Sequence, residues 1–205
     1  MSQGYFFIAL GKQYIDECVL LVDTIRKNND SRPVSLLIHE EDAEYAKDKG
    51  YFDKLIEFKP DDELWKECKT SFEKYCLYPR LYLNEYLPYE ENIIVDSDVL
   101  CQSNTERLWL YFSTQQYPIR MLGRKYDPSW HWGHITEVSN KYGKWIPHVH
   151  GGFFYIRKND FLNTFFEYCK DVFYKYDDYG CIRGFRGGRV DEIIFAIAHS
   201  HLIGI

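Results

Sequence analysis

Apolar and polar positions follow two different periods along the chain, and together they predict a sheet that alternates with helices. The stretch YFFIAL, residues 5–10, is apolar throughout, which is typical of a strand buried in a parallel sheet. Apolar residues then recur at helical spacing from Ile15 to Ile25, and the polar run 28–30 ends that helix. The order strand, helix, strand, helix, strand over the first 60 residues predicts a doubly wound α/β fold.

The same patterns place further elements along the rest of the chain. Further strands are expected at 33–40, 54–58, 93–98, 117–122, 151–158 and 201–205. Helices are expected at 40–49, 71–86, 104–112, 159–176 and 191–198. Pro79 is expected to kink or break the second of these helices, and Asn104 to cap the third. Residues 127–144 show no clean period and are expected to form a long structured loop.

Composition and charge narrow the classes of function. The chain has 205 residues, 45% of them apolar, which is enough to bury a substantial core. Its net charge of −6, without a basic stripe, argues against a nucleic-acid binder. No apolar run approaches the roughly 20 residues that span a bilayer, and the start lacks the features of a signal peptide. We therefore expect a cytoplasmic protein without a transmembrane segment.

The six cysteines are scattered, and no Cys-x-x-Cys pair occurs. This spacing argues against a zinc ribbon and against a dense disulfide framework. Three pairs of histidines have spacings that can bind zinc, although surface or hydrogen-bonding roles are more common for such pairs. They are His131 with His134, His148 with His150, and His199 with His201.

The stretch IIVDSDVL, residues 93–100, carries the most informative chemistry. Asp96 and Asp98 end a predicted strand, and ligands of open α/β sheets bind beyond the carboxyl ends of strands. Residues two apart in extended chain point the same way, so the two carboxylates are expected to face one point. They would repel each other there unless a cation lay between them, and Mg²⁺ or Mn²⁺ that bridges to a diphosphate suits such oxygen ligands. The alternative is a solvated strand end or an aspartate that caps the next turn.

Residues 78–100, YPRLYLNEYLPYEENIIVDSDVL, resemble the segment that leads to the metal-binding Asp-x-Asp motif of GT-A-fold glycosyltransferases, notably glycosyltransferase family 8. In that family a helix with an Arg-Leu pair precedes a Leu-Pro turn, a hydrophobic strand and the acidic triplet. FFIALGKQYIDECVLLVDTIRKNN is similar to the family's first strand, nucleotide loop and helix. GGFFYIRK resembles a later strand of the donor pocket, and VDEIIFAIA resembles an acidic pair that opens a helix near the acceptor.

The resemblance implies a single GT-A, Rossmann-like domain over residues 1–205, with a mixed, mostly parallel central sheet flanked by helices. Residues 1–100 would form its nucleotide-binding half, and residues 101–205 its donor and acceptor half. The implied activity is the transfer of a hexose from a UDP-sugar to a hydroxyl acceptor, such as a glycan or a lipid-linked saccharide. Mn²⁺ or Mg²⁺ is the implied cofactor, and both inversion and retention at the anomeric carbon remain open.

The resemblance also implies roles in donor binding. Asp96 and Asp98 would hold the metal and the donor diphosphate, and Ser97 would lie near the ribose. Further residues, which follow the first strand, would border the nucleotide: Ala9, Leu10, Gly11 and Tyr14.

Five other residues would complete the site. Arg80 would reach the donor sugar or its phosphate, although an ordinary surface arginine on a helix is the alternative. Gly151 and Gly152 would let the sugar approach the backbone, unless they simply form a bulge. Asp191 and Glu192 would contact the acceptor hydroxyl or act on it as catalytic groups. Their alternative role is to complement the positive end of a helix dipole.

Two features depart from the family's pattern. The later strand opens with His150-Gly151-Gly152, where the family has a sequence like Asn-Ala-Gly. The family's third metal ligand is a histidine well beyond the helix of the acidic pair, and no such segment lies within the 205 residues. His199 and His201 are the histidines nearest to that place.

Two glycine- or tryptophan-containing loops have alternative interpretations. The loop DPSWHWGHIT, residues 127–136, is either a sugar-stacking platform or a segment held down by buried tryptophans. The loop GCIRGFRGGR, residues 180–189, is either a lid with arginines for phosphate or a flexible surface loop.

Two other functions compete with glycosyl transfer. A nucleotidyltransferase also uses an α/β sheet with metal-binding acids, but it would normally have a glycine-rich, basic phosphate loop after the first strand, where this chain has ALGKQYIDE. The second alternative is a non-catalytic domain that binds carbohydrate or nucleotide.

Overall fold

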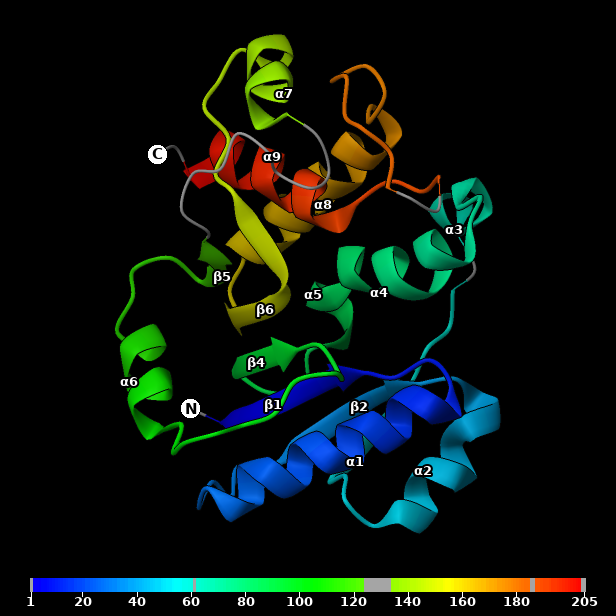
Figure 1. Cartoon of the computed structure of the whole chain (residues 1–205), viewed down its shortest axis with the longest axis vertical. Coiled ribbons are helices and arrows are strands. Elements are labelled where there is room, and N and C mark those ends of the chain that lie inside the picture. The colour runs from blue at the N-terminus through cyan, green and yellow to red at the C-terminus, as the bar shows by residue number, and fades with distance from the viewer. Residues whose placement is uncertain (1, 61, 124–133, 185–186, 204–205) are drawn as a thin grey trace. The chain divides into compact units, whose positions relative to one another are not determined.

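The computed structural model describes residues 2–60, 62–123, 134–184 and 187–203. The chain divides into two compact units (Figure 1). The first unit comprises Met1–Pro60, Glu85–Arg120 and Gly152–Asn159, and the second comprises Asp61–Asn84, Met121–Gly151 and Asp160–Ile205. The organisation as one domain, with halves at 1–100 and 101–205, stays a prediction.

A mixed, mostly parallel sheet organises the first unit. Its strand order in the described part of the chain is β3-β2-β1-β4-β6-β5. The parallel strands are β1 (Gln3–Ile8), β2 (Val34–Ile38), β3 (Lys54–Glu57) and β4 (Glu91–Val95). The strand β6 (Val149–Arg157) runs antiparallel to β4, and β5 (Ile119–Gly123) forms the edge. This sheet confirms the predicted fold class, with strand ends shifted by a few residues.

The strand order reverses at β1. Tyr5 pairs with Val34 of β2 on one side and with Ile93 of β4 on the other, both in parallel register. The carboxyl ends of β1 and β4 therefore lie at a topological switch point, where open α/β sheets bind ligands. The segments that follow these two strands are the nucleotide loop and the acidic triplet expected from the sequence.

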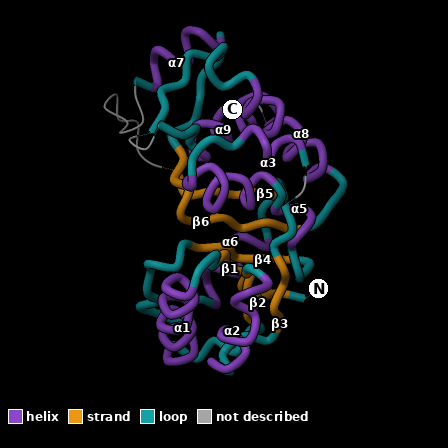
Figure 2. The backbone as a smooth tube through the Cα atoms, turned by 90° about the vertical axis from the view of Figure 1, so that its right-hand side faces the viewer, coloured by secondary structure: helices purple, strands orange, loops and turns teal. Residues whose placement is uncertain are grey.

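Helices α1 and α6 cover one face of this sheet. The helices and turns of the first unit are α1 (Lys12–Lys27), the 3₁₀ turn η1 (Glu40–Asp42), α2 (Ala43–Lys49) and α6 (Glu106–Ser113). Alternate residues of β1, such as Tyr5 and Phe7, point into a core that α1 fills with Cys18 and Val22. Trp109 of α6 closes the same core. Figures 1 and 2 show α1 and α2 running beside β1 and β2.

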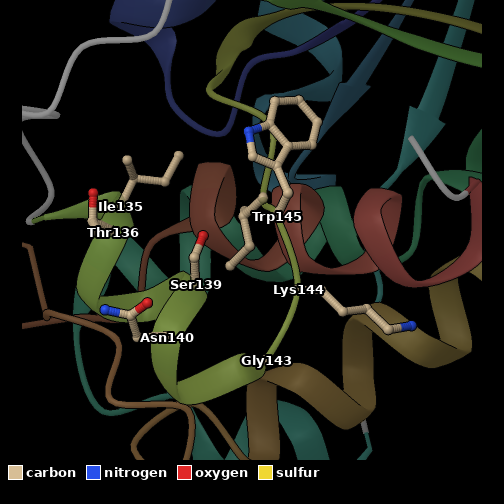
Figure 3. Close-up of a pocket in the computed structure, with 8 residues that line it drawn as sticks. Ile135, Thr136, Ser139, Asn140, Gly143, Lys144 and Trp145 are labelled. Atoms are coloured by element: carbon tan, nitrogen blue, oxygen red, sulfur yellow. The ribbon is translucent and has the colours of Figure 1, made fainter.

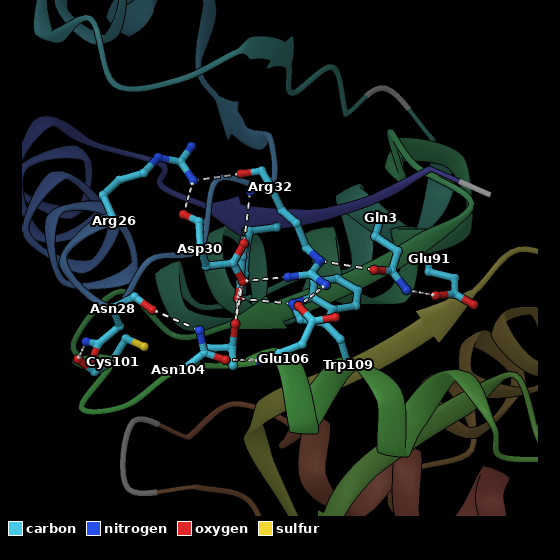
Figure 4. Close-up of polar contacts among 12 residues, drawn as sticks. Gln3, Arg26, Asn28, Asp30, Arg32, Glu91, Cys101, Asn104, Glu106 and Trp109 are labelled. Atoms are coloured by element: carbon cyan, nitrogen blue, oxygen red, sulfur yellow. Dashed lines mark hydrogen bonds and ion pairs between the residues drawn. The ribbon is translucent and has the colours of Figure 1, made fainter.

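A buried polar network ties β1, the turn after α1 and the start of α6 together (Figure 4). The Asp30 carboxylate accepts hydrogen bonds from the Tyr5 hydroxyl at 2.8 Å and from Arg32 Nη1 at 3.0 Å, and it also accepts one from Thr105. Arg32 reaches on to Glu106 at 2.7 Å. Burial opposes the charge of Asp30, but these hydrogen bonds outweigh it and hold the pKa of the carboxyl below its usual value.

The second unit is mainly helical, and it also contains the last residues of β5 and the first residues of β6. Its helical elements are α3 (Glu63–Glu67), the π-helical turn η2 (Glu73–Leu77), α4 (Tyr78–Leu81), the start of α5 (Leu83–Tyr86), α7 (Ile135–Tyr142), α8 (Phe161–Tyr174) and α9 (Asp191–Ile203). The helix predicted over 71–86 is broken into η2, α4 and α5, and Pro79 lies in the first turn of α4. The residues on both sides of Pro79 are helical, the π-helical turn η2 ends two residues before the proline, and Tyr82 separates α4 from α5.

Three local predictions were wrong. The expected strand at 201–205 is not formed in its described part, because residues 201–203 continue the apolar helix α9. The expected loop at 127–144 contains α7, while its residues 127–133 lie outside the described residues. The helix expected from Asn104 begins later, at α6, yet the Asn104 side chain still accepts a hydrogen bond from the Glu106 N–H at 2.9 Å.

Helices α8 and α9 pack through phenylalanine rings. The rings of Phe165 and Phe195 are stacked, with their centroids 6.2 Å apart.

A fully buried carboxylate, Glu73, joins η2 to the segment before α9. It accepts hydrogen bonds from the N–H and from Nη1 of Arg189, both at 2.9 Å. Burial opposes the charge of Glu73, but the hydrogen bonds outweigh it and lower the pKa of its carboxyl.

All six cysteines are free thiols, in agreement with the expected absence of a disulfide framework. Among the described residues, no helix is both long enough and apolar enough to cross a membrane.

Candidate functional site

The loop after β1 has a backbone shape that only glycine adopts readily. Ala9 is buried, and its N–H extends the pairing of β1 with β2 by donating to the Leu37 carbonyl at 2.9 Å. Gly11 has φ of 132° and forms the N-cap of α1, where its carbonyl accepts the N–H of Tyr14 at 3.0 Å. The Tyr14 side chain is 45% exposed beside this turn, while Leu10 is buried. The turn thus presents a bare backbone and an exposed aromatic ring at the switch point.

The acidic triplet follows β4, but it is not extended. Asp96 leaves the strand, and Ser97 and Asp98 form a turn. The premise that Asp96 and Asp98 point the same way because they lie in extended chain is therefore wrong, although they remain close along one short turn. The Asp96 N–H donates to the Gly152 carbonyl at 3.2 Å, which fixes the start of the turn to β6, while Asp98 is exposed.

Glu17 of α1 holds the middle of the triplet. The Ser97 hydroxyl donates to Glu17 Oε2 at 2.5 Å, and the Gln13 side chain donates to the other carboxylate oxygen at 3.3 Å. Sequence reasoning missed Glu17, because the residue looks like one more charge on a solvated helix face. The available signal was its spacing: Glu17 lies three residues after Tyr14 and so shares its face of the helix.

A second group of expected residues meets in the second unit. The Arg80 guanidinium of α4 forms an ion pair with Asp191, the first residue of α9. The N–H of Gly151 donates to Glu192 Oε1 at 2.9 Å. A Cβ on Gly151 would lie 2.9 Å from Asp191 Oδ2 and 3.2 Å from Arg80 Nη1, so the absence of a side chain permits this close approach.

Both interpretations of the acidic pair are compatible with this geometry. Asp191 and Glu192 are buried at the start of a 13-residue helix, where negative charge complements the helix dipole. The same carboxylates are held by Arg80 and Gly151, two of the three residues expected to handle the donor sugar. The second unit thus brings four expected site residues together. Gly152, the triplet and the loop after β1 belong to the first unit.

Two arginines of the loop at 180–189, Arg183 and Arg189, are engaged within the second unit. Arg183 pairs with Asp177 at 2.7 Å, and Arg189 pairs with the buried Glu73. Residues 185 and 186 lie outside the described residues, as do Trp130 and Trp132 of the other loop. The observed pairing favours a structural role for Arg183 and Arg189.

The residues of the triplet fit a hard divalent cation. Asp96 and Asp98 offer carboxylate oxygens on a partly exposed turn, and Mg²⁺ or Mn²⁺ typically takes one or two carboxylates together with substrate phosphates and waters. Within the described ranges no group of three histidines, cysteines or carboxylates is arranged to hold a metal, and His199 and His201 form no such group there.

The sequence matches no described protein family, and no curated protein is detectably similar to it. The fold, in contrast, is similar to solved glycosyltransferases. The galactosyltransferase LgtC, in complex with donor and acceptor sugar analogs, matches with a TM-score of 0.64 at 14% identity over 95% of this chain and 69% of that chain.

Two other glycosyltransferases match over a smaller share of their own length. GlyE of Streptococcus pneumoniae matches with a TM-score of 0.57 at 13% identity, over 100% of this chain and 44% of GlyE. The bifunctional glycosyltransferase WbbM matches with a TM-score of 0.56 at 10% identity, over 84% of this chain and 34% of WbbM. The chain thus spans about two thirds of LgtC and less than half of the other two. It has a GT-A-like fold, with a six-stranded, mostly parallel sheet flanked by helices in its described part.

Proposed function

We propose that this protein is a glycosyltransferase that moves a hexose from a UDP-sugar to a hydroxyl acceptor, a glycan or a lipid-linked saccharide, with Mn²⁺ or Mg²⁺. One observation supports the proposal most strongly. The acidic triplet and the glycine turn follow the two parallel strands that meet at the switch point of a GT-A-like sheet, and the Ser97–Glu17 hydrogen bond joins the triplet to α1.

The glycine turn and the triplet bind different parts of the donor. Gly11 keeps the backbone open to the nucleotide, and Tyr14 offers a ring on which a base or ribose can pack. Asp96 and Asp98 hold the cation, and Ser97 is kept in place by Glu17. A bound cation would supply positive charge against the negative charge that the diphosphate gains as a leaving group.

The group in the second unit is assigned to the sugar and the acceptor. Gly151 leaves room beside the buried carboxylates, and Arg80 holds Asp191 by an ion pair. Asp191 is the candidate base for the acceptor hydroxyl in an inverting reaction, because a base must then face the leaving group across the ring. A retaining reaction needs no base at that place. Proton NMR of the product anomer distinguishes the two courses.

Turnover of UDP-sugars tests the proposal. Purified protein with Mn²⁺ is incubated with UDP-glucose or UDP-galactose and a saccharide acceptor, and released UDP is quantified. Asp96→Ala and Asp98→Ala are each expected to abolish UDP release, whereas Asp178→Ala, on an exposed turn of the second unit, is expected to leave it unchanged. Full activity in either triplet variant would refute the assignment.

The non-catalytic alternative makes a different prediction. The observation behind this alternative is that, among the described residues, no group of three histidines, cysteines or carboxylates is arranged to hold a metal. A domain that only binds nucleotide would bind UDP without releasing it from any UDP-sugar, whatever the metal.

A further inference from the structure

A cavity of about 480 Å³ lies in the second unit between α7 and the segment that follows it (Figure 3). This volume is within the range of about 300–1,000 Å³ that small-molecule sites typically occupy. Its polar lining residues are Thr136, Ser139 and Asn140 of α7, and Lys144 and Trp145 of the segment that follows.

The chain folds back on itself to form this cavity. Helix α7 ends at Gly143, which has φ of 76° and donates its N–H to the Ser139 carbonyl at 2.8 Å. This left-handed turn sends the chain back along the helix, so that Trp145 lines the same space as Ile135 and Ser139. The Trp145 carbonyl is fixed by a hydrogen bond from the Ser200 hydroxyl of α9.

The Trp145 residue is only half-buried. It is 52% exposed, although its neighbour Ile146 and the α7 residue Ile135 are buried. In Figure 3 Ile135 and the Trp145 ring lie to either side, and the Ser139 hydroxyl below them points toward the region that separates them. A rigid aromatic face at a cavity with a fixed backbone is suited to stack on a flat, partly apolar ligand.

Apart from Lys144, the polar side chains that line the cavity are neutral. Thr136, Ser139 and Asn140 lie at helical spacing on one side of α7 and offer two hydroxyls and an amide, which both donate and accept hydrogen bonds. The lining residue Lys144 points away from Ser139 and Asn140 in Figure 3, and its Nζ lies 3.4 Å from His201 Nδ1. A ligand with many hydroxyls and no charge matches these partners better than a phosphate or a carboxylate does.

We propose that this cavity is a binding site for a neutral saccharide, which stacks on Trp145 and forms hydrogen bonds with Ser139 and Asn140. The choice of ligand rests on the proposed glycosyltransferase function, because the acceptors of that reaction include saccharides. The site binds a sugar unit of an acceptor chain, and the reacting hydroxyl belongs to another unit of that chain.

Saturation-transfer NMR with four neutral disaccharides, namely lactose, maltose, cellobiose and N,N′-diacetylchitobiose, tests the proposal. At least one of them is expected to receive saturation from the wild-type protein. Trp145→Ala is expected to weaken that binding roughly tenfold, because an aromatic contact contributes close to the 1.4 kcal/mol that a factor of ten represents. Asn140→Ala, at an exposed position, is a milder variant that is expected to weaken binding while keeping the fold.

Tyr174→Ala is the matched control, because Tyr174 of α8 is also 52% exposed in the second unit and does not line the cavity. It is expected to bind the disaccharide as the wild type does. Binding that survives in both Trp145→Ala and Asn140→Ala would overturn the proposal, and so would the absence of binding by any of the four sugars.

The variant Asp96→Asn distinguishes the saccharide site from the donor site. It removes a proposed donor-site carboxylate and is expected to keep disaccharide binding. Disaccharide binding without any turnover of UDP-sugars would refute the proposed function and leave the saccharide site standing. Turnover without disaccharide binding would refute the saccharide site alone.

Discussion

Replacing Asp30 with asparagine removes the charge at the centre of the polar network in the first unit (Figure 4). The Asp30 side chain is 2% exposed, and one of its oxygens accepts hydrogen bonds from Tyr5, Thr105 and Arg32. An amide nitrogen in that place is a donor that faces the guanidinium of Arg32, which has no acceptor. The two hydroxyls can turn and accept instead, so the loss concentrates on the ion pair.

The magnitude follows from what remains around Arg32. Removing one partner of a buried ion pair costs about 3–5 kcal/mol of the free energy of unfolding. Arg32 is partly exposed and keeps Glu106 at 2.7 Å, so we expect a loss of about 2–3 kcal/mol for Asp30→Asn. For a chain of this length the melting temperature falls by roughly 4–12 °C.

Urea and thermal unfolding measure this loss, and Glu106→Gln is the matched control. Glu106 is the other carboxylate partner of the same arginine, but its side chain is 68% exposed, so its removal is expected to cost less than about 1 kcal/mol. If Asp30→Asn destabilises the protein no more than Glu106→Gln does, the reasoning about the buried network is refuted.

The same carboxylate predicts a pH dependence. The pKa of Asp30 is lower in the folded protein than its ordinary value of 3.8, so the folded state binds fewer protons than the unfolded chain. The stabilisation is complete above that ordinary value and is lost as the pH falls through the folded pKa. In Asp30→Asn the free energy of unfolding should therefore fall less steeply with decreasing pH than in the wild type. Equal slopes in the two proteins would contradict the assignment of this pH dependence to Asp30.

Three further changes test other parts of the account. Gly151→Ala places a Cβ 2.9 Å from an Asp191 oxygen and is expected to reduce UDP-sugar turnover roughly 10- to 100-fold, while unchanged turnover would exclude the group from the site. Glu17→Ala should weaken UDP binding roughly fivefold in calorimetry, since one hydrogen bond to Ser97 is lost, and Glu17→Gln should restore it; equal affinities in all three proteins would contradict a positioning role. Glu73→Gln leaves a buried arginine without its carboxylate and should lower the free energy of unfolding by about 3–5 kcal/mol in urea, so a loss below 1 kcal/mol would show that the pair does not stabilise the fold.

The fold was predictable from the sequence because local patterns decide it. The apolar run at 5–10 and the helical spacing from Ile15 to Ile25 gave β1 and α1 with ends shifted by at most two or three residues. Pro79 marked the broken helix. The segment at 201–205 failed because His-Leu-Ile reads equally well as strand or helix, and only the preceding α9 decides between them.

The site was less predictable, because its contacts join residues far apart in the sequence. The Arg80–Asp191 ion pair spans 111 positions and the Ser97–Glu17 hydrogen bond spans 80, and no local pattern encodes either contact. The family resemblance singled out Arg80, Ser97 and Asp191, but it gave no partner for any of them, and Glu17 looked like an ordinary charge on a helix. The cavity beside Trp145 was also hidden, because it depends on a left-handed turn at Gly143 inside a stretch without a clean period.

Thermal-shift titration with UDP tests the central claim most directly, with GDP and CDP beside it and with and without Mn²⁺. The account predicts that UDP raises the melting temperature only when Mn²⁺ is present. A hundredfold excess over the dissociation constant corresponds to about 2.7 kcal/mol, or roughly 5–11 °C. The shift should vanish in Asp96→Asn and Asp98→Asn. No shift with any nucleotide, or a UDP shift that persists in both variants, would contradict a donor site at the acidic triplet.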